Sequence, residues 1–182
     1  MQLTNTQWEN AAVFMQTMAR PLEQTLFDYH FDNGSVVTVL DKLAEFQNED
    51  GGFGHGLEPD MQATDSSVLA TTVALQRLRV LGADGSNSLV RQAIQFLHKT
   101  YSPTQQSWPF IPPSVKNAPH APWWRYGADY TKHWHNPRPE VVGYLLDWED
   151  GDLGRQLLTA VLETASHTKN ITMHDLYFYL RL

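Results

Sequence analysis

Apolar positions recur along most of this chain at the three- and four-residue spacing of an amphipathic α-helix. In the segment 36–47, for example, Val39, Leu43 and Phe46 fall on one side of such a helix. No segment bounded by turn residues shows the strict apolar–polar alternation of a half-buried strand. The pattern therefore predicts an all-α protein with helices at 6–19, 21–29, 36–47, 68–81, 87–100, 139–148, 153–166 and 172–182.

Residues that start or stop helices stand at the ends of these segments. Pro21 favours a break after the first helix and suits the first turn of the second. Ser35 is placed to cap the third helix, and a serine or asparagine is placed to cap the helix 87–100. Gly82 follows the fourth helix where a left-handed residue commonly ends one. The capping residues thus support the boundaries that the apolar pattern predicts.

The segment 101–136 interrupts the helical pattern. Six prolines divide it, namely Pro103, Pro109, Pro112, Pro113, Pro119 and Pro122. Its large aromatic residues include Trp108, Phe110, Trp123, Trp124, Tyr126, Tyr130 and Trp134. A loop of this length is either functional or disordered, and so many aromatic side chains argue against disorder. We therefore expect an ordered, irregular Trp/Pro-rich loop.

The composition excludes several classes of function. The 182 residues are 42% hydrophobic and 18% charged, as in an ordinary globular domain, and the formal net charge is −7 at pH 7. An acidic chain without basic clusters does not attract nucleic acid or an anionic membrane. The lack of cysteine excludes disulfides, thiolate metal ligands and thiol nucleophiles. Because neither a signal-peptide pattern nor a membrane-length apolar run occurs, we predict a cytoplasmic protein without a membrane span.

The stretch QNEDGGFGHGLEPD, which begins at Gln47, is the most unusual in the chain and has two halves. In the first half, Gly51 and Gly52 permit positive φ angles, and Asp50 can accept hydrogen bonds from backbone N–H groups of the turn. Gln47 can bond free backbone groups nearby while Phe53 packs over it. These five residues predict a structural turn.

The second half of this glycine-rich stretch carries groups that a turn does not require. His55, Glu58 and Asp60 are candidate catalytic residues, because an imidazole and carboxylates can exchange protons with a substrate. The pair His55 and Glu58 could also ligate a metal. In the alternative interpretation, these residues form hydrogen bonds at the surface or cap a helix. No second pair of ligands accompanies them, so the sequence assigns no metal and does not identify a cofactor.

A second group of candidates lies in the Trp/Pro-rich loop. Its ligand-binding candidates are His120, Trp123, Trp124, Tyr126, His133 and His135. Aromatic faces suit sugar rings or isoprenoid chains, and imidazoles can supply polar contacts. In the alternative interpretation, the aromatic side chains fill space and cover the core. Replacing Trp124 with alanine separates the two, because a core cover loses stability whereas a binding surface loses its ligand.

The glycine-rich stretch also resembles a known repeat. LAEFQNEDGGFGHGLEPD is similar to the Gln-x-x-Asp-Gly-Gly-aromatic repeats of the terpenoid cyclase and protein prenyltransferase superfamily, and SSVLATTVALQRL looks like the helix that follows such a repeat. The motifs ARPLEQTLFDY, APHAPWW and NPRPEVVGYLL extend the resemblance to bacterial proteins with prenyltransferase and squalene-oxidase repeats. The resemblance implies an α/α toroid, in which paired helices form inner and outer rings around a central cavity.

The chain departs from that superfamily in its catalytic motifs. It has neither the Asp-x-Asp-Asp motif of protonating cyclases nor the Asp-Asp-x-x-Asp motif that holds magnesium, and it lacks the cysteine of the prenyltransferase zinc site. It also supplies fewer helical hairpins than a full toroid. We therefore expect a partial toroid in one domain, 1–182, that is incomplete at its C-terminus.

Three functions remain open, because a fold does not determine a function. The first is the binding or processing of an apolar, isoprenoid-like small molecule in a cavity lined by the glycine-rich stretch and the Trp/Pro-rich loop. The second is the binding or processing of a carbohydrate by the same kind of fold. The third is a non-catalytic interaction module that forms a homodimer through an open apolar edge. The sequence does not assign a reaction.

Overall fold

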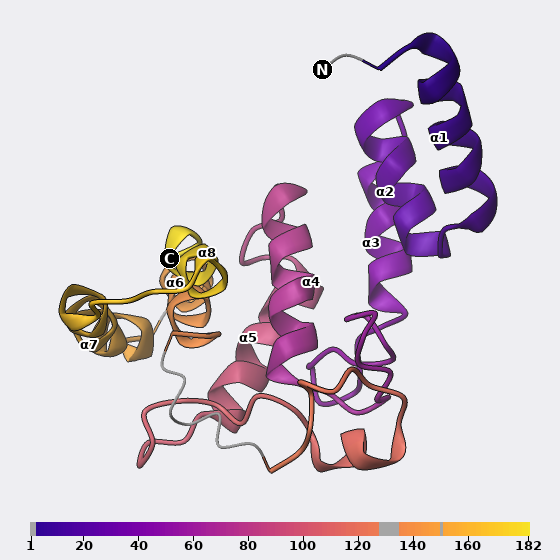
Figure 1. The fold of residues 1–182 in the computed structure, drawn as a ribbon. Coiled ribbons are helices and arrows are strands. Elements are labelled where there is room, and N and C mark those ends of the chain that lie inside the picture. The colour runs from indigo at the N-terminus through magenta and orange to yellow at the C-terminus, as the bar shows by residue number, and fades with distance from the viewer. Residues whose placement is uncertain (1–2, 128–134, 150) are drawn as a thin grey trace. The chain divides into compact units, whose positions relative to one another are not determined.

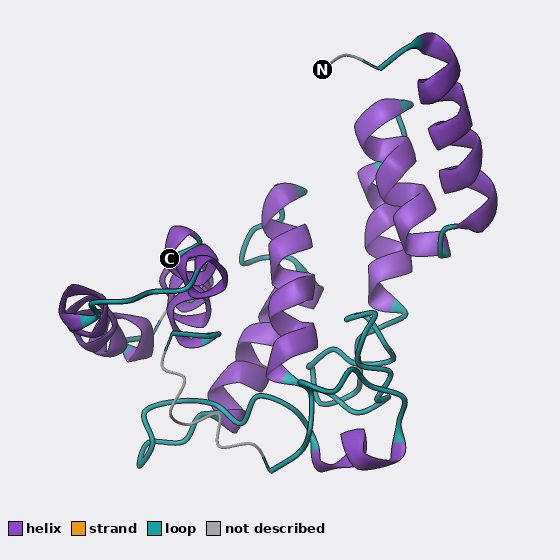
Figure 2. Ribbon diagram, in the orientation of Figure 1, coloured by secondary structure: helices purple, strands orange, loops and turns teal. Residues whose placement is uncertain are grey.

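The computed structural model describes residues 3–127, 135–149 and 151–182. Within these ranges the chain forms eight α-helices and one 3₁₀ helix and contains no β-strand (Figure 1, Figure 2). The predicted all-α class is therefore confirmed. The chain divides into two compact units, Met1–Glu45 and Phe46–Leu182, which we call the N-terminal and the C-terminal unit.

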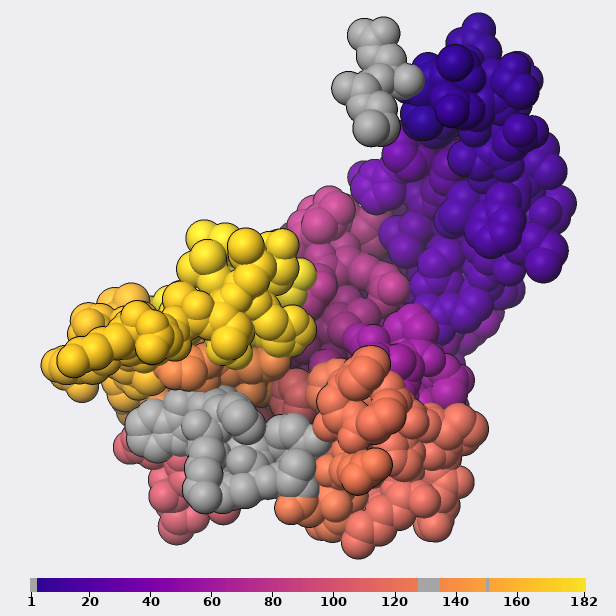
Figure 3. All heavy atoms as spheres, viewed as in Figure 1, coloured from indigo at the N-terminus to yellow at the C-terminus, as the bar shows by residue number. Residues whose placement is uncertain are grey.

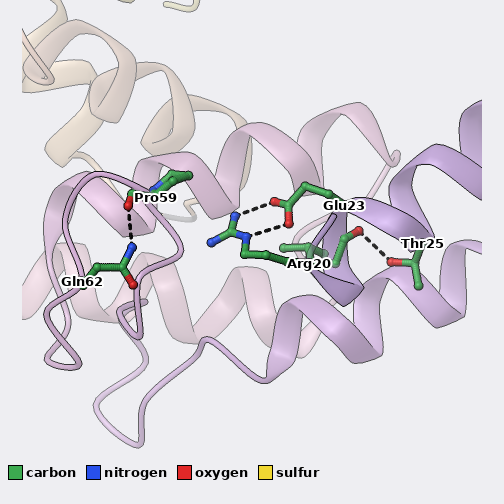
Figure 4. A network of polar contacts seen from close by, with 6 residues as sticks. Arg20, Glu23, Thr25, Pro59 and Gln62 are labelled. Atoms are coloured by element: carbon green, nitrogen blue, oxygen red, sulfur yellow. Dashed lines mark hydrogen bonds and ion pairs between the residues drawn. The ribbon is translucent and has the colours of Figure 1, made fainter. Parts of the chain in front are cut away.

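The N-terminal unit consists of three helices, α1 (Asn5–Met18), α2 (Pro21–Phe31) and α3 (Val36–Ala44). Helix α2 packs against both α1 and α3. Thr4 and Gln7 form a capping box at the start of α1, and the Ser35 hydroxyl caps α3 as predicted. Arg20, just before α2, holds Glu23 in the first turn by two hydrogen bonds of 2.8 and 2.6 Å (Figure 4).

The core of the N-terminal unit is small. Leu22, Val39 and Leu43 are fully buried, whereas α1 contributes no fully buried side chain. Trp8 of α1 stacks on Phe27 at a ring distance of 5.7 Å, and 39% of its surface stays exposed. A unit of this length can enclose only a few side chains, because its surface is large relative to its volume.

The C-terminal unit contains the remaining elements, α4 (Val68–Val80), α5 (Ser88–Thr100), η1 (Pro113–Asn117), α6 (Arg138–Trp148), α7 (Leu153–His167) and α8 (Met173–Leu180). Helix α4 pairs with α5, and α6 pairs with α7. Helix α6 also contacts α4, α5 and α8, and it is buried from Arg138 to Leu145. Ser67 caps α4 and Asn87 caps α5. Helix α6 is thus the central element of this unit.

Two helices end two or more residues earlier than the apolar pattern predicts. Helix α3 ends at Ala44, because Gln47 turns away to form an isolated β-bridge with Phe53. Helix α8 ends at Leu180 with Arg181 as its C-cap, although the pattern continues to residue 182.

No helix in the described residues is long and apolar enough to cross a membrane.

The described part of the segment between α5 and α6 is irregular apart from η1. Its side chains nevertheless pack closely, and the part of it drawn in salmon and orange stands out at the lower right of the space-filling view (Figure 3). Trp108 is 3% exposed, and its indole N–H donates to the Leu97 carbonyl at 2.6 Å. Phe110 and Ile111 are buried as well. This segment is therefore part of the core of the C-terminal unit.

Candidate functional site

The glycine-rich turn, residues 47–53, forms hydrogen bonds with two helices of the C-terminal unit. Gln47 Nε2 donates to the carbonyl of Gly51 (2.9 Å) and to that of Leu89 in the first turn of α5 (3.1 Å). Phe53 is fully buried, and its N–H donates to Thr71 Oγ1 of α4 (3.0 Å). The residues that the sequence assigns to a turn therefore also tie that turn to α4 and α5.

Asp50 and the two glycines shape the turn itself. Asp50 Oδ1 accepts hydrogen bonds from the Gly52 N–H (3.0 Å) and from Ser66 Oγ (2.7 Å). Gly51 has a φ of +91° and approaches α5 so closely that a Cβ atom would lie 2.4 Å from the Gln92 carbonyl oxygen. A side chain at Gly51 would therefore meet both backbone strain and a steric clash.

His55 belongs to a chain of hydrogen bonds on the exposed side of the turn. Its Nε2 lies 2.8 Å from Asn48 Oδ1. Asn48 Nδ2 donates to Ser66 Oγ at 2.9 Å, and Ser66 Oγ donates to Asp50 Oδ1 at 2.7 Å. The imidazole of His55 is thus oriented by an amide within a network that ends at the Asp50 carboxylate.

Asp60 lies instead against the Trp/Pro-rich loop. Its Oδ1 accepts from Trp124 Nε1 (2.6 Å) and its Oδ2 accepts from Trp123 Nε1 (3.0 Å). Glu58 is half-buried, and its carbonyl accepts from the Met61 N–H at 3.0 Å. Two of the three catalytic candidates, His55 and Asp60, are therefore held by different partners.

His120 stands beside the contact that Asp60 makes. It pairs with Met61 through an isolated β-bridge, and its Nδ1 lies 2.7 Å from the Ala118 carbonyl. The backbone of the glycine-rich stretch and the backbone of the Trp/Pro-rich loop are joined here. The structure thus brings one catalytic candidate next to three ligand-binding candidates, namely Asp60 next to His120, Trp123 and Trp124.

The other loop candidates have separate surroundings. Tyr126 is 43% exposed, and Lys116 Nζ lies 4.5 Å from the centre of its ring. His135 Nδ1 lies 2.7 Å from the Tyr179 hydroxyl of α8, and His133 is outside the described residues. In the described part of the chain, no three His, Asp or Glu side chains gather closely enough to hold a metal ion.

A cavity of about 720 Å³ opens beside the glycine-rich turn. Its lining comes from four separate segments, namely Asn48, Glu49, Asp50, Asp65, Ser66, Ser67, Val68, Phe96, Thr100, Pro109, Ile111, Pro112 and Pro113. One part of this lining is apolar and rich in proline, and the other part carries three carboxylates. The lining residues include neither lysine nor arginine.

The cavity uses residues that the sequence analysis assigned to a turn or to no site. Asp50 is the one candidate residue that lines it, and Asp50 was predicted to be structural. The prolines of the loop were the available signal in the sequence, because they interrupt the helical pattern there. Nothing in the local sequence indicated that Phe96 of α5 would face the same space as Asp65. The cavity exists because segments distant in sequence pack together.

Helix α6 begins with buried ionisable groups that the sequence analysis did not assign to a site. Arg138 and Glu140 are both 0% exposed. The Tyr144 hydroxyl donates to Glu140 Oε1 (2.5 Å), and Arg181 Nη1 lies 3.5 Å from the same oxygen. The signal in the sequence was the pair Arg138 and Glu140 at the start of RPEVVGYLL, a segment that is otherwise mostly apolar.

Burial has the largest effect on the pKa values of Arg138, Glu140 and Tyr144. It raises the pKa of the Glu140 carboxyl, although the hydrogen bond from Tyr144 and the positive charge of Arg181 act in the opposite direction. Burial likewise lowers the pKa of Arg138 and raises that of Tyr144. Glu140 is fully buried and contacts Arg181, the C-cap of α8, so it links α6 to α8.

Comparisons with known proteins do not place this chain in a family. No model of a protein family matches it, and no curated protein and no solved structure is significantly similar to it. The assignment of a function therefore depends on the geometry and chemistry of the residues described above.

Proposed function

We propose that the C-terminal unit is part of an α/α toroid of the terpenoid cyclase type and that it binds a small molecule in the cavity beside the glycine-rich turn. The cavity is the observation that carries this proposal. Its volume of about 720 Å³ lies within the range of small-molecule sites. The pairs α4–α5 and α6–α7 are compatible with the helical hairpins of such a toroid.

The lining of the cavity selects the chemistry of the ligand. Val68, Phe96 and Ile111, together with three prolines, offer an apolar surface. Glu49 and Asp65 are exposed carboxylates at the same cavity, and no basic side chain among the lining residues balances them. The ligand that fits has an apolar body and a neutral or positively charged head. A diphosphate head, as in activated isoprenoids, is disfavoured by repulsion between like charges.

Three probes with the same alkyl chain test this proposal. Octylamine is protonated at pH 7, 1-octanol is neutral, and octyl phosphate is anionic. We expect the affinity, measured by NMR titration of ¹⁵N-labelled protein, to fall in that order, with shifts at the amides of Ser66, Ser67 and Val68 that line the cavity. Equal or tighter binding of octyl phosphate, or shifts confined to other regions, would contradict the proposal.

A matched pair of variants tests the role of the carboxylates. The double variant Glu49→Gln, Asp65→Asn keeps the shapes of both side chains and removes two negative charges. We expect it to bind octylamine about three- to tenfold more weakly, as for the loss of exposed charge interactions, and to bind 1-octanol as before. Glu163→Gln removes an exposed carboxylate of α7 and should change neither affinity. A similar loss for both probes would show that charge does not select the ligand.

A further inference from the structure

The three carboxylates that line the cavity differ in how they are held. Asp50 Oδ1 accepts two hydrogen bonds, from the Gly52 N–H at 3.0 Å and from Ser66 Oγ at 2.7 Å. Among the described residues, nothing forms a hydrogen bond or an ion pair with the side chain of Glu49 or of Asp65. Asp50 is therefore the carboxylate whose position is set before a ligand arrives, which lowers the entropy lost when a ligand binds to it.

The second oxygen of the Asp50 carboxylate remains available as an acceptor. Both hydrogen bonds to this side chain go to Oδ1, and Oδ2 accepts none from the described residues. Asp50 lines the cavity, whose lining residues include neither lysine nor arginine. The cavity thus contains an oriented negative charge that no basic side chain of its lining balances.

The apolar part of the lining meets this carboxylate at Gly52. A Cβ atom at Gly52 would lie 2.6 Å from the Cβ atom of Ser66 and 2.7 Å from the ring of Phe96, so both side chains lie directly beside the backbone that Asp50 binds. Phe96 is buried and lines the same cavity. One small molecule can therefore contact Asp50 with a polar head and Phe96 with the apolar atoms next to that head.

Three uncharged polar side chains of the lining use their hydrogens within the protein. Asn48 Nδ2 donates to the Thr64 carbonyl at 3.1 Å and to Ser66 Oγ at 2.9 Å, which accounts for both of its hydrogens. The Ser66 hydroxyl donates to Asp50, and Thr100 Oγ1 donates to a carbonyl of its own helix at 2.8 Å. These side chains have no hydrogen left for a ligand, so a ligand that binds beside them supplies the donors itself.

The N-terminus of α4 also lies at the cavity, and a helix N-terminus attracts anions. Here the protein already binds two of its N–H groups. Ser67 Oγ accepts from the Ala70 N–H at 2.9 Å, and the Phe110 carbonyl accepts from the Leu69 N–H at 3.3 Å. Together with the three carboxylates, these contacts disfavour an anionic head and leave a cationic donor as the best match.

We propose that Asp50 binds the protonated primary amino group of a ligand whose apolar body lies against the apolar lining of the cavity. This inference rests on the proposed function and narrows it, because a neutral or positively charged head becomes an ammonium that carries N–H groups. A primary ammonium brings a positive charge and three donors to the carboxylate oxygens. An alcohol lacks the charge, and a quaternary ammonium lacks the donors.

Two cationic probes with the same alkyl chain, octylamine and octyltrimethylammonium, test this inference. Both carry one positive charge at pH 7, but only octylamine can donate hydrogen bonds. In NMR titrations of the ¹⁵N-labelled full chain, we expect octylamine to bind about tenfold more tightly, as for the loss of a hydrogen bond to a charged group. The amide of Gly52, which donates to Asp50, should shift with octylamine.

Three variants test the part that Asp50 takes in this preference. Asp50→Asn keeps an oxygen acceptor for Gly52 and removes the charge, so it should bind octylamine about tenfold more weakly and 1-octanol as before. Glu49→Gln removes the same charge from a carboxylate that no hydrogen bond orients, and it should weaken octylamine binding less than about threefold. Ser66→Ala leaves the charge of Asp50 in place but removes one of the two bonds that orient it. It should reduce the preference for octylamine over octyltrimethylammonium, even if Asp50→Asn does not fold.

Two results would overturn the inference and leave the proposed function intact. The first is equal or tighter binding of octyltrimethylammonium in the cavity, because charge and apolar contact would then suffice. The second is an equal loss of octylamine affinity in Asp50→Asn and Glu49→Gln, because the orientation of Asp50 would then not matter. If no octyl probe shifts the amides of Ser66, Ser67 and Val68, the proposed function fails and this inference fails with it.

Discussion

Replacing Gly51 with alanine is expected to destabilise the C-terminal unit by about 3 kcal/mol. About 1 to 2 kcal/mol comes from the left-handed backbone, since the φ of Gly51 is +91°. The rest, about 1 to 3 kcal/mol, comes from overlap, because the new Cβ atom would lie 2.4 Å from the backbone oxygen of Gln92. A backbone atom of a packed helix cannot move aside as the end of a flexible side chain can. The measurement is urea denaturation followed by tryptophan fluorescence.

Gly82 provides the matched control for this substitution. It also has a positive φ, +73°, but a Cβ atom there would meet no other atom within 4 Å. Gly82→Ala should therefore lose only the backbone contribution, about 1 kcal/mol. Five of the six tryptophans lie in the C-terminal unit, so the fluorescence signal reports mainly on its unfolding. Equal losses for the two variants would show that the close approach of Gly51 to α5 does not contribute to stability.

Replacing Glu140 with alanine is expected to destabilise the C-terminal unit by about 2 to 4 kcal/mol, the range expected for a cavity together with a buried polar group that loses its hydrogen-bond partner. The variant leaves a cavity and takes away the acceptor of the Tyr144 hydroxyl, a side chain that is 1% exposed. Glu140→Gln keeps the shape and an oxygen acceptor, so it should lose less. Glu163→Ala, on the exposed side of α7, should stay within about 0.5 kcal/mol of the parent.

The pH dependence of stability separates the charge of Glu140 from its shape. Burial raises the pKa of Glu140 above the 4.5 of an ordinary glutamate, so the folded state holds the proton more tightly than the unfolded state. Its contribution to the free energy of unfolding is therefore most favourable below pH 4.5 and decreases as the pH rises through the folded pKa. Glu140→Gln should lack this decrease. If the parent and Glu140→Gln show parallel stability curves across that range, the carboxyl is not held in its protonated form by burial.

Local chemistry was sufficient to predict much of the helical framework. Ser35 and Asn87 cap their helices through hydrogen bonds to residues two positions away. Gly82 takes the left-handed conformation directly after α4, where the sequence places a helix end. Each of these features involves only residues within one turn of the helix. Patterns over a few residues therefore contain the necessary information.

Contacts between residues far apart in the sequence explain the places where the local pattern predicts the structure wrongly. The helix predicted from the apolar spacing continues to residue 47, yet α3 ends at Ala44. Gln47 instead bonds the carbonyl of Leu89, forty-two positions further along the chain. The same reason explains the candidate site, because His55 is held by Asn48 whereas Asp60 is held by Trp123 and Trp124. The spacing of His55 and Asp60 within one stretch could not show that these two residues would bind different partners.

The sequence by itself determined the helical class, the helix caps and the position of the glycine-rich turn, because each depends on interactions between neighbours in the chain. The tertiary structure alone decided which of two adjacent tryptophans faces solvent, which carboxylates line a cavity and which glutamate is buried. Trp123 and Trp124 are chemically identical and differ only in what packs against them. Burial is a property of the whole packed unit, since it depends on segments far apart in sequence that meet only when the chain folds.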